Sequence, residues 1–259
     1  MEFTQHIIFA FFLTILAGLS TGIGSAIAYF IKKPKMVYLS FSLGFSAGVM
    51  IYVSFVELLP RAIITIGNIM SMIPFFIGIV FIGCIDMVIP EPQNPHHYKD
   101  MTNISNIKEK KLLLRTGLFT AFAIAVHNFP EGLATFGTTL SDERLGVVIA
   151  IAIAIHNIPE GISVSVPIFY ATGDREKAFK YSFLAGLAEP VGAAIGFLIF
   201  LPFLSSTVLI ALLAFVAGIM VYISIDELLP MAHKYGHSHT VILGFILGMF
   251  LMAISLILL

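Results

Sequence analysis

Residues 145–170, LGVVIAIAIAIHNIPEGISVSVPIFY, form an apolar run that is interrupted near its middle by polar residues. The run is longer than the roughly 20 residues that a helix needs to cross the hydrocarbon core of a membrane. It carries one carboxylate, Glu160, and no lysine or arginine. This pattern predicts a membrane-spanning helix that buries a histidine, an asparagine, a proline and a glutamate.

The composition of the whole chain indicates an integral membrane protein. The 259 residues have a mean hydropathy of +0.99, and 58% of them are hydrophobic while only 11% are charged. A soluble domain of this size would contain about 25% charged residues. The formal net charge of −1 gives no electrostatic footprint for nucleic acid. Because Cys84 is the one cysteine, neither a disulfide framework nor a thiolate metal cluster is available.

Seven further apolar runs have similar lengths, so the sequence predicts an all-α membrane protein with eight transmembrane helices. We expect the spans at residues 7–30, 37–59, 72–90, 113–138, 145–170, 180–200, 207–229 and 240–259. Together they would make a single transmembrane domain over residues 1–259. The start of the chain, MEFTQH, has no basic residue before the first run, which favours a retained span over a secretory signal.

The distribution of basic residues predicts the orientation of the spans. Twelve of the fourteen lysine and arginine residues lie in the connections that follow spans one, three, five and seven, and the exceptions are Arg61 and Arg144. The positive-inside rule therefore places these four connections in the cytoplasm and both chain termini outside the cell membrane. The longest of them, residues 91–112, is predicted to be a cytoplasmic loop between spans three and four.

A sequence repeat predicts how the spans are related. FSAGVMIYVSFVELLPRA at 45–62 pairs with FVAGIMVYISIDELLPMA at 215–232. These segments belong to spans two and seven, which cross the membrane in opposite directions. We therefore expect an inverted repeat that relates spans 1–3 to spans 6–8, with spans 4 and 5 paired at the centre. Inverted repeats are common in secondary transporters, whose binding sites lie near the midplane.

The polar core of the opening stretch also occurs twice, as AIAVHNFPEG at 123–132 and AIAIHNIPEG at 152–161. On a helix, a histidine and a glutamate four residues apart lie on the same face. The two spans are joined by a short turn, so their half-sites are expected to face each other. Span six adds Glu189 within GLAEPVGA.

The predicted site offers imidazole nitrogens, carboxylates and amide oxygens to a metal ion. This mixture suits Zn(II), Fe(II), Mn(II), Co(II) or Ni(II), and it lacks the sulfur that would select Cu(I). A cation would also provide the partner that buried carboxylates require. The candidate metal ligands are His127, Asn128, Glu131, His156, Asn157, Glu160 and Glu189.

The repeated segments of spans two and seven add a second set of candidates. Met50, Ser54 and Glu57 are spaced i, i+4, i+7, and Met220, Ser224 and Glu227 have the same spacing. Our hypothesis is that a transport path runs along these faces, with Glu57 at its external end and Asp226 and Glu227 at its cytoplasmic end. The alternative is that these residues only pack helices together.

Two other classes of function stay open. An intramembrane metal-dependent hydrolase could use the same ligands to activate water, but it would need a substrate cleft and commonly an HExxH element, which this sequence lacks. A membrane metal sensor that does not transport is the second alternative. The sequence contains no GxxxxGK[ST] motif for nucleotide binding. We expect no resident cofactor, since the metal would be the transported substrate, and no enzymatic activity.

At HNFPEG, HNIPEG and GLAEP the sequence resembles the ZIP family of divalent metal transporters, and the resemblance extends over essentially the whole chain. It implies eight spans, external termini and import of Zn(II) into the cytoplasm, with a metal site of one or two ions between spans four and five. It also implies that the seven candidate residues above are ligands, that Met50 is a further contact, and that the protein forms a homodimer in the lipid bilayer.

Overall fold

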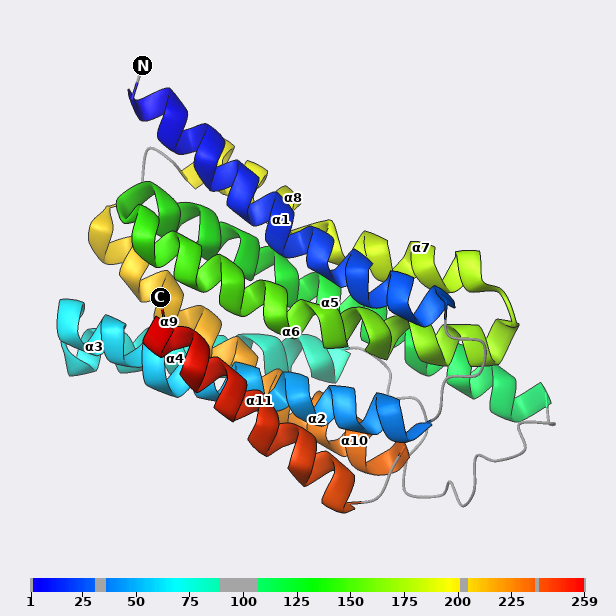
Figure 1. Ribbon diagram of the computed structural model, residues 1–259. Helices are drawn as coiled ribbons and strands as arrows, with labels where there is room; N and C mark the ends of the chain where they lie inside the picture. Colours follow the sequence, from blue (N-terminus) through cyan, green and yellow to red (C-terminus); the bar gives the residue numbers. More distant parts are fainter. Residues whose placement is uncertain (1, 31–35, 89–106, 201–204, 236–237, 259) are drawn as a thin grey trace.

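The computed structural model describes residues 2–30, 36–88, 107–200, 205–235 and 238–258. Within these ranges a few side chains, including that of His127, lie outside the described part of the structure. Figure 1 shows long helices that lie side by side in one elongated bundle. The described residues contain no strand, so the prediction of an all-α membrane protein is confirmed.

Five of the described helical rods are single helices, and three are composite. The single helices are α1 (Glu2–Phe30), α4 (Asn68–Val88), α5 (Ile107–Ser141), α6 (Glu143–Thr172) and α11 (Ser238–Leu258). The first composite rod joins α2 (Met36–Val53), η1 (Ser54–Leu58) and α3 (Leu59–Ile66). The second joins α7 (Arg175–Gly186), α8 (Ala188–Ile195) and η3 (Gly196–Phe200), and the third joins α9 (Ser206–Ile223), η5 (Ser224–Leu228) and α10 (Leu229–Tyr235).

Seven of the rods in the described residues are long and apolar enough to cross a membrane by length and composition. The eighth rod, α5, has the length of a span, but its first turns are charged and its middle carries the first HNFPEG element. The chain is therefore a multi-pass membrane protein. The predicted loop at 91–112 lies mainly outside the described residues, and its last part, from Ile107 onward, is helical because α5 begins there.

Local sequence signals explain the breaks between the rods. The Asp142 side chain accepts a hydrogen bond from the Leu145 backbone N–H and so caps the start of α6, which makes the turn after α5 very short. The π-helical turns η1 and η5 each lie just before a proline, Pro60 or Pro230. Proline cannot donate a backbone hydrogen bond, and a wider turn before it accommodates its ring without ending the rod.

The helices group into two sub-bundles. In the first, α1 packs on α6 and α5 packs on both α6 and α8, with α7 beside α1. In the second, α2 packs on α11 and α4 packs on α9. The sub-bundles meet where α6 contacts α2 and α5 contacts α9. Figure 1 shows α5 and α6 in the middle of the molecule, between α1 with α7 on one side and α2 with α11 on the other.

Glycines allow the helices of the second sub-bundle to approach closely in matched pairs. A Cβ atom added at Gly48 would lie 2.1 Å from the Phe245 carbonyl oxygen, and one at Gly248 would lie 2.1 Å from that of Phe45. Spans three and seven show the same kind of contact: a Cβ atom added at Gly78 would lie 2.1 Å from the Phe215 carbonyl oxygen, and one at Gly218 would lie 2.0 Å from that of Phe75. An exchange of spans two and three with spans seven and eight would convert the first pair of contacts into the second. The inverted repeat itself stays a prediction.

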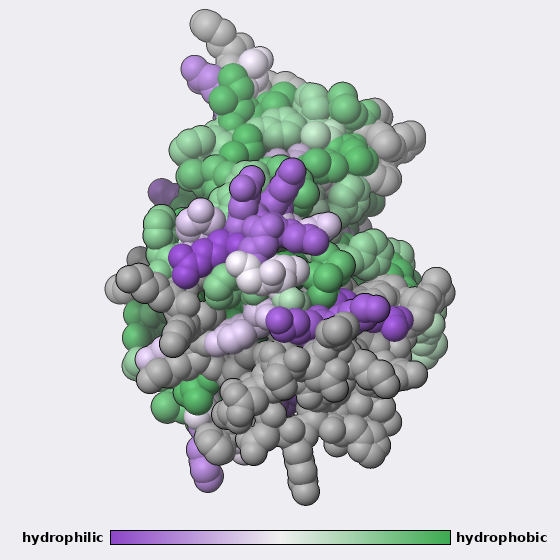
Figure 2. Space-filling model, turned by 90° about the vertical axis from the view of Figure 1, so that its right-hand side faces the viewer, coloured by the Kyte–Doolittle hydropathy of each residue, from purple (hydrophilic) through white to green (hydrophobic). Residues whose placement is uncertain are grey.

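The two ends of the bundle differ. The end that holds Asp142, α3 and the outer parts of α1 and α11 is called the turn end below (Figure 1). His6 Nδ1 lies 2.9 Å from Glu143 Oε1 at this end, which joins α1 to α6. Figure 2 shows the opposite end, called the loop end, where hydrophilic side chains gather near the centre of the face. The positive-inside rule predicts that the loop end faces the cytoplasm.

Candidate metal centre

Six of the seven predicted ligands lie completely buried in the middle of the first sub-bundle. They come from three helices, α5, α6 and α8, and each has 0% exposed surface: Asn128, Glu131, His156, Asn157, Glu160 and Glu189. We call these six residues the polar cluster. His127, the seventh, belongs to α5, but its side chain lies outside the described part of the structure.

The two repeated half-sites face each other. His156 Nε2 on α6 lies 3.3 Å from Glu131 Oε1 on α5. On the third helix, Glu189 accepts a hydrogen bond from the side-chain amide of Asn157. The structure therefore pairs His156 with Glu131 and Asn157 with Glu189, and Glu160 lies one helical turn beyond His156.

The asparagine side chains are oriented by their amide groups. Asn128 Nδ2 donates to the Ala185 carbonyl at 3.3 Å, and Asn157 Nδ2 donates to the Ala17 carbonyl at 3.1 Å. The Oδ1 atoms of both asparagines, and Oε2 of Glu189, are buried without a hydrogen-bond partner. Buried oxygens of this kind are costly unless something else binds them. They are ligand atoms that a divalent cation accepts.

The carboxyl groups of the cluster also lie close to one another. Glu160 interacts electrostatically with His156, Glu131 and Glu227, and Glu189 interacts with Glu131 and Glu160. Among the described side chains, three carboxyl groups thus lie near the His156 imidazole in a fully buried region, where like charges would repel. Among the residues whose side chains are described, no three His, Cys, Asp or Glu side chains are close enough to hold one metal ion as they stand.

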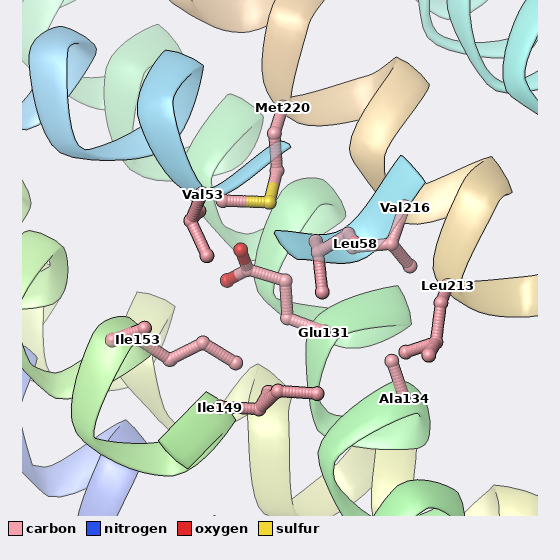
Figure 3. A pocket seen from close by; sticks show the side chains of 10 residues that line it. Val53, Leu58, Glu131, Ala134, Ile149, Ile153, Leu213, Val216 and Met220 are labelled. Carbon is pink, nitrogen blue, oxygen red and sulfur yellow. The ribbon is translucent and has the colours of Figure 1, made fainter. Parts of the chain in front are cut away.

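A small cavity adjoins Glu131 on the side of the turn end. Its volume is about 10 Å³, roughly the space of one water molecule. Figure 3 shows the Glu131 carboxylate pointing into it among apolar side chains from α2, η1, α5, α6 and α9. We call the apolar lining the plug: Val53, Leu58, Ala134, Ile149, Ala152, Ile153, Leu213, Val216 and Met220.

Charged residues lie beyond the plug, at the turn end. Arg61 Nη1 lies 3.7 Å from Glu57 Oε1, and Arg61 Nη2 lies 3.0 Å from Asp142 Oδ2. Because Arg61 belongs to α3 and Asp142 precedes α6, this second ion pair joins the two sub-bundles. Glu57 therefore lies at the turn end of the rod, and it is only partly buried. Its place at the external end stays a prediction.

On the other side of the cluster, carboxylates continue toward the loop end. Glu227 on η5 interacts electrostatically with Glu160, Asp86 and Asp226. The Tyr222 hydroxyl donates to Asp86 Oδ2 at 3.3 Å. Glu57 and Glu227 thus lie on opposite sides of the polar cluster. Glu57 lies beside Arg61, whereas Glu227 lies near Asp86 and Asp226.

Two methionines of the repeated segments have different surroundings. Met50 is fully buried and accepts a weak hydrogen bond from Ser46, which also donates to the backbone carbonyl of His156 at 3.4 Å. Met220 lines the cavity beside Glu131 (Figure 3). The sequence placed both methionines on the faces of the proposed path, and the family resemblance implied Met50 alone as a metal contact.

Comparison with known proteins identifies the family of this chain. The family model described as ZIP Zinc transporter matches residues 89–256, which contain both HNxPEG elements and Glu189. The chain belongs to the ZIP family. This ZIP chain is 52% identical to Zinc transporter ZupT of Clostridium perfringens (strain 13 / Type A), with 98% of this chain and 97% of the relative covered.

Other ZIP relatives match to the same extent. The chain is 54% identical to Zinc transporter ZupT of Streptococcus mutans serotype c, with 98% of this chain and 99% of the relative covered. It is 55% identical to Zinc transporter ZupT of Chlorobium phaeovibrioides, over 96% of this chain and 97% of the relative. The chain is therefore a member of a transporter family and not an enzyme, as the sequence predicted.

Proposed function

We propose that this chain carries divalent metal ions, Zn(II) and also Fe(II), Mn(II) or Co(II), through the polar cluster into the cytoplasm. The observation that supports this best is the cluster itself: six fully buried polar residues from three helices, with three oxygen atoms that have no hydrogen-bond partner. The relatives that match nearly the full chain are named zinc transporters, which supports the choice of Zn(II).

The surroundings of the cluster support one direction of access in this conformation. Toward the turn end the plug leaves a cavity for about one water molecule, which is too narrow for a hydrated divalent ion. Toward the loop end, Glu160 is followed by Glu227 and then by Asp86 and Asp226. We infer that the cluster is closed to the outside and releases its ion along these acidic side chains.

The division into two sub-bundles provides a way to alternate access. All described residues of the cluster belong to α5, α6 and α8 of the first sub-bundle. Much of the plug, including Val53, Leu213 and Met220, belongs to α2 and α9 of the second. Displacement of one sub-bundle against the other would therefore carry the ion past the plug, as in other transporters built from repeats. Dimerisation of the chain stays a prediction.

The small cavity argues against a hydrolase. An enzyme of that class needs room for a substrate beside the metal, and the cavity next to Glu131 has a volume of about 10 Å³.

The purified protein in vesicles that contain a zinc-sensitive dye tests the proposal. We expect the dye signal to rise when Zn(II) is added outside, and to rise more slowly when Fe(II), Mn(II) or Co(II) competes in tenfold excess. Vesicles without protein are the control. Zinc binding to the protein without any rise in the dye signal would favour the sensor over the transporter.

Glu227→Gln is expected to lower the rate of zinc uptake by roughly 10-fold, since it replaces a carboxyl group near Glu160 by an amide of the same shape. Glu57→Gln is expected to have an effect in the same range at the other end of the path. The matched control is Glu176→Gln, which changes an exposed glutamate in the first turn of α7. Unchanged affinity and rate in both test variants would contradict a role in the path and would mean that these residues only pack helices together.

Arg61→Gln is expected to change the uptake rate by less than about fivefold, although Arg61 joins the two sub-bundles. The pair with Asp142 is partly exposed, and such pairs contribute about 0.2–1 kcal/mol. The measurement is the initial rate of zinc uptake, with melting temperature recorded in parallel. A loss greater than tenfold with an unchanged melting temperature would mean that this ion pair is required for transport.

A further inference from the structure

Helix α1 and the α7–α8 rod contact the half-sites through matched pairs of residues. Asn157 donates to the carbonyl of Ala17, and Asn128 donates to that of Ala185. A Cβ atom added at Gly18 would lie 2.7 Å from the Gly186 carbonyl oxygen, and one at Gly186 would lie 2.6 Å from that of Gly18. Ala17 is followed by Gly18 just as Ala185 is followed by Gly186.

The same register pairs Thr21 with Glu189. Gly161, the last residue of HNIPEG, lies against the Thr21 carbonyl. A Cβ atom added at Gly161 would be 2.1 Å from that oxygen. The first element, at Gly132, approaches the Glu189 carbonyl in the same way, at 1.9 Å. The local sequences agree with this pairing, since GLSTGIGS at 18–25 aligns with GLAEPVGA at 186–193.

The Thr21 side chain is buried, and its hydroxyl makes no hydrogen bond. Its exposed surface is 0%, and its Oγ1 atom has no hydrogen-bond partner. Thr14, about two turns earlier in α1, instead donates its hydroxyl to the Ala10 carbonyl at 2.9 Å. A buried hydroxyl that is left unpaired costs about 1–3 kcal/mol. The Thr21 hydroxyl is therefore available to an ion or a water molecule that enters the cluster.

We propose that Thr21 is a specificity-determining residue of the metal centre. Glu189 supplies a carboxyl oxygen beside Asn157. Thr21 Oγ1 lies near Gly186, since a Cβ atom added there would be 3.0 Å away, and the neighbouring Ala185 carbonyl accepts from Asn128, whose Oδ1 is also unpaired. The threonine side chain is shorter than glutamate, so its hydroxyl would reach an ion in the cluster through one bound water. The inference rests on the proposed function of the cluster as the transport site.

This asymmetry favours ions that retain water and accept oxygen ligands. Mn(II) prefers oxygen ligands and water more strongly than Zn(II), which binds nitrogen well. Loss of the hydroxyl therefore affects Mn(II) more than Zn(II). A residue that only packs α1 against α7 would affect both metals equally.

The test compares uptake of Mn(II) and Zn(II) by vesicles that contain wild type, Thr21→Val, Thr21→Ser or Thr14→Val. We expect Thr21→Val to raise the KM for Mn(II) about tenfold and that for Zn(II) less than threefold, with kcat nearly unchanged. Thr21→Ser restores the hydroxyl and should return both values to within about twofold of wild type. Thr14→Val is the matched control, since it removes a buried hydroxyl from the same helix.

Equal changes for the two metals, or no change in Thr21→Val, would overturn the assignment while leaving the proposed function intact. Absence of uptake by wild type and by Thr14→Val would instead contradict the proposed function. If Thr21→Val does not give a monodisperse protein, Thr21→Ala removes the hydroxyl without adding volume and is interpreted by the same ratio of KM values.

Discussion

Replacement of Glu131 by alanine is expected to reduce kcat/KM for zinc uptake by more than about 100-fold. Substitution of residues that only support a metal ligand costs about 10–100-fold, and loss of a ligand should cost more. Glu131 pairs with His156 inside the polar cluster, and its carboxylate also points into the cavity beside the plug (Figure 3). It therefore lies between the cluster and the plug. The measurement is the initial rate of uptake as a function of zinc concentration.

Glu143→Gln is the matched control for this prediction. Glu143 begins α6, and its half-exposed side chain pairs with His6 at the turn end. It lies more than three helical turns before His156 on the same helix. Its loss should change uptake by less than about fivefold, as expected for an exposed ion pair. Uptake by Glu131→Ala at more than a tenth of the wild-type rate would remove Glu131 from the proposed set of ligands.

Gly132→Ala is expected to be the most damaging single-methyl change in the first sub-bundle. The new Cβ atom would lie 1.9 Å from the Glu189 carbonyl oxygen, so α5 and α8 would have to separate. Alanine favours a helix over glycine by about 1 kcal/mol. Overpacking against backbone, which cannot rotate away, costs about 3 kcal/mol or more and therefore outweighs this gain. The expected result is a melting temperature several degrees lower in detergent, with little uptake.

Gly83→Ala in α4 provides the comparison. A Cβ atom at Gly83 would lie 3.2 Å from the Tyr222 ring, which is a side chain that can shift by a few tenths of an ångström. This variant should keep a melting temperature close to that of wild type. If the two alanine variants melted at the same temperature, the close approach of α5 to α8 at Gly132 would not be a feature of the protein in solution.

The architecture followed from simple properties of the sequence. Each apolar run is long enough to span a membrane, and in a membrane a helix is the local way to satisfy every backbone group. The facing of His156 and Glu131 was also predictable, because a histidine and a glutamate four residues apart recur on two helices that are joined by a short turn. Burial of Glu189 followed from its place in an apolar run.

Other features depend on packing between distant segments, which residue spacing does not encode. The plug combines apolar residues from α2, η1, α5, α6 and α9, and none of them differs in type from residues that face lipid. The approach of Arg61 to Asp142 depends on the length of α3 beyond Pro60. Thr21 lacks any sequence signal of its own. Its position opposite Gly161 becomes visible only when α1 is docked on α6.

The central claim is that a metal ion crosses the membrane through the polar cluster. It is tested most directly by uptake of radioactive zinc into sealed vesicles that contain wild type, His156→Ala or Glu160→Ala, with external zinc removed by a chelator before counting. We predict counts that resist the chelator in wild type and fall by more than about 100-fold in both variants. Chelator-resistant counts that persist in both variants, or wild-type counts that the chelator removes completely, would contradict the claim.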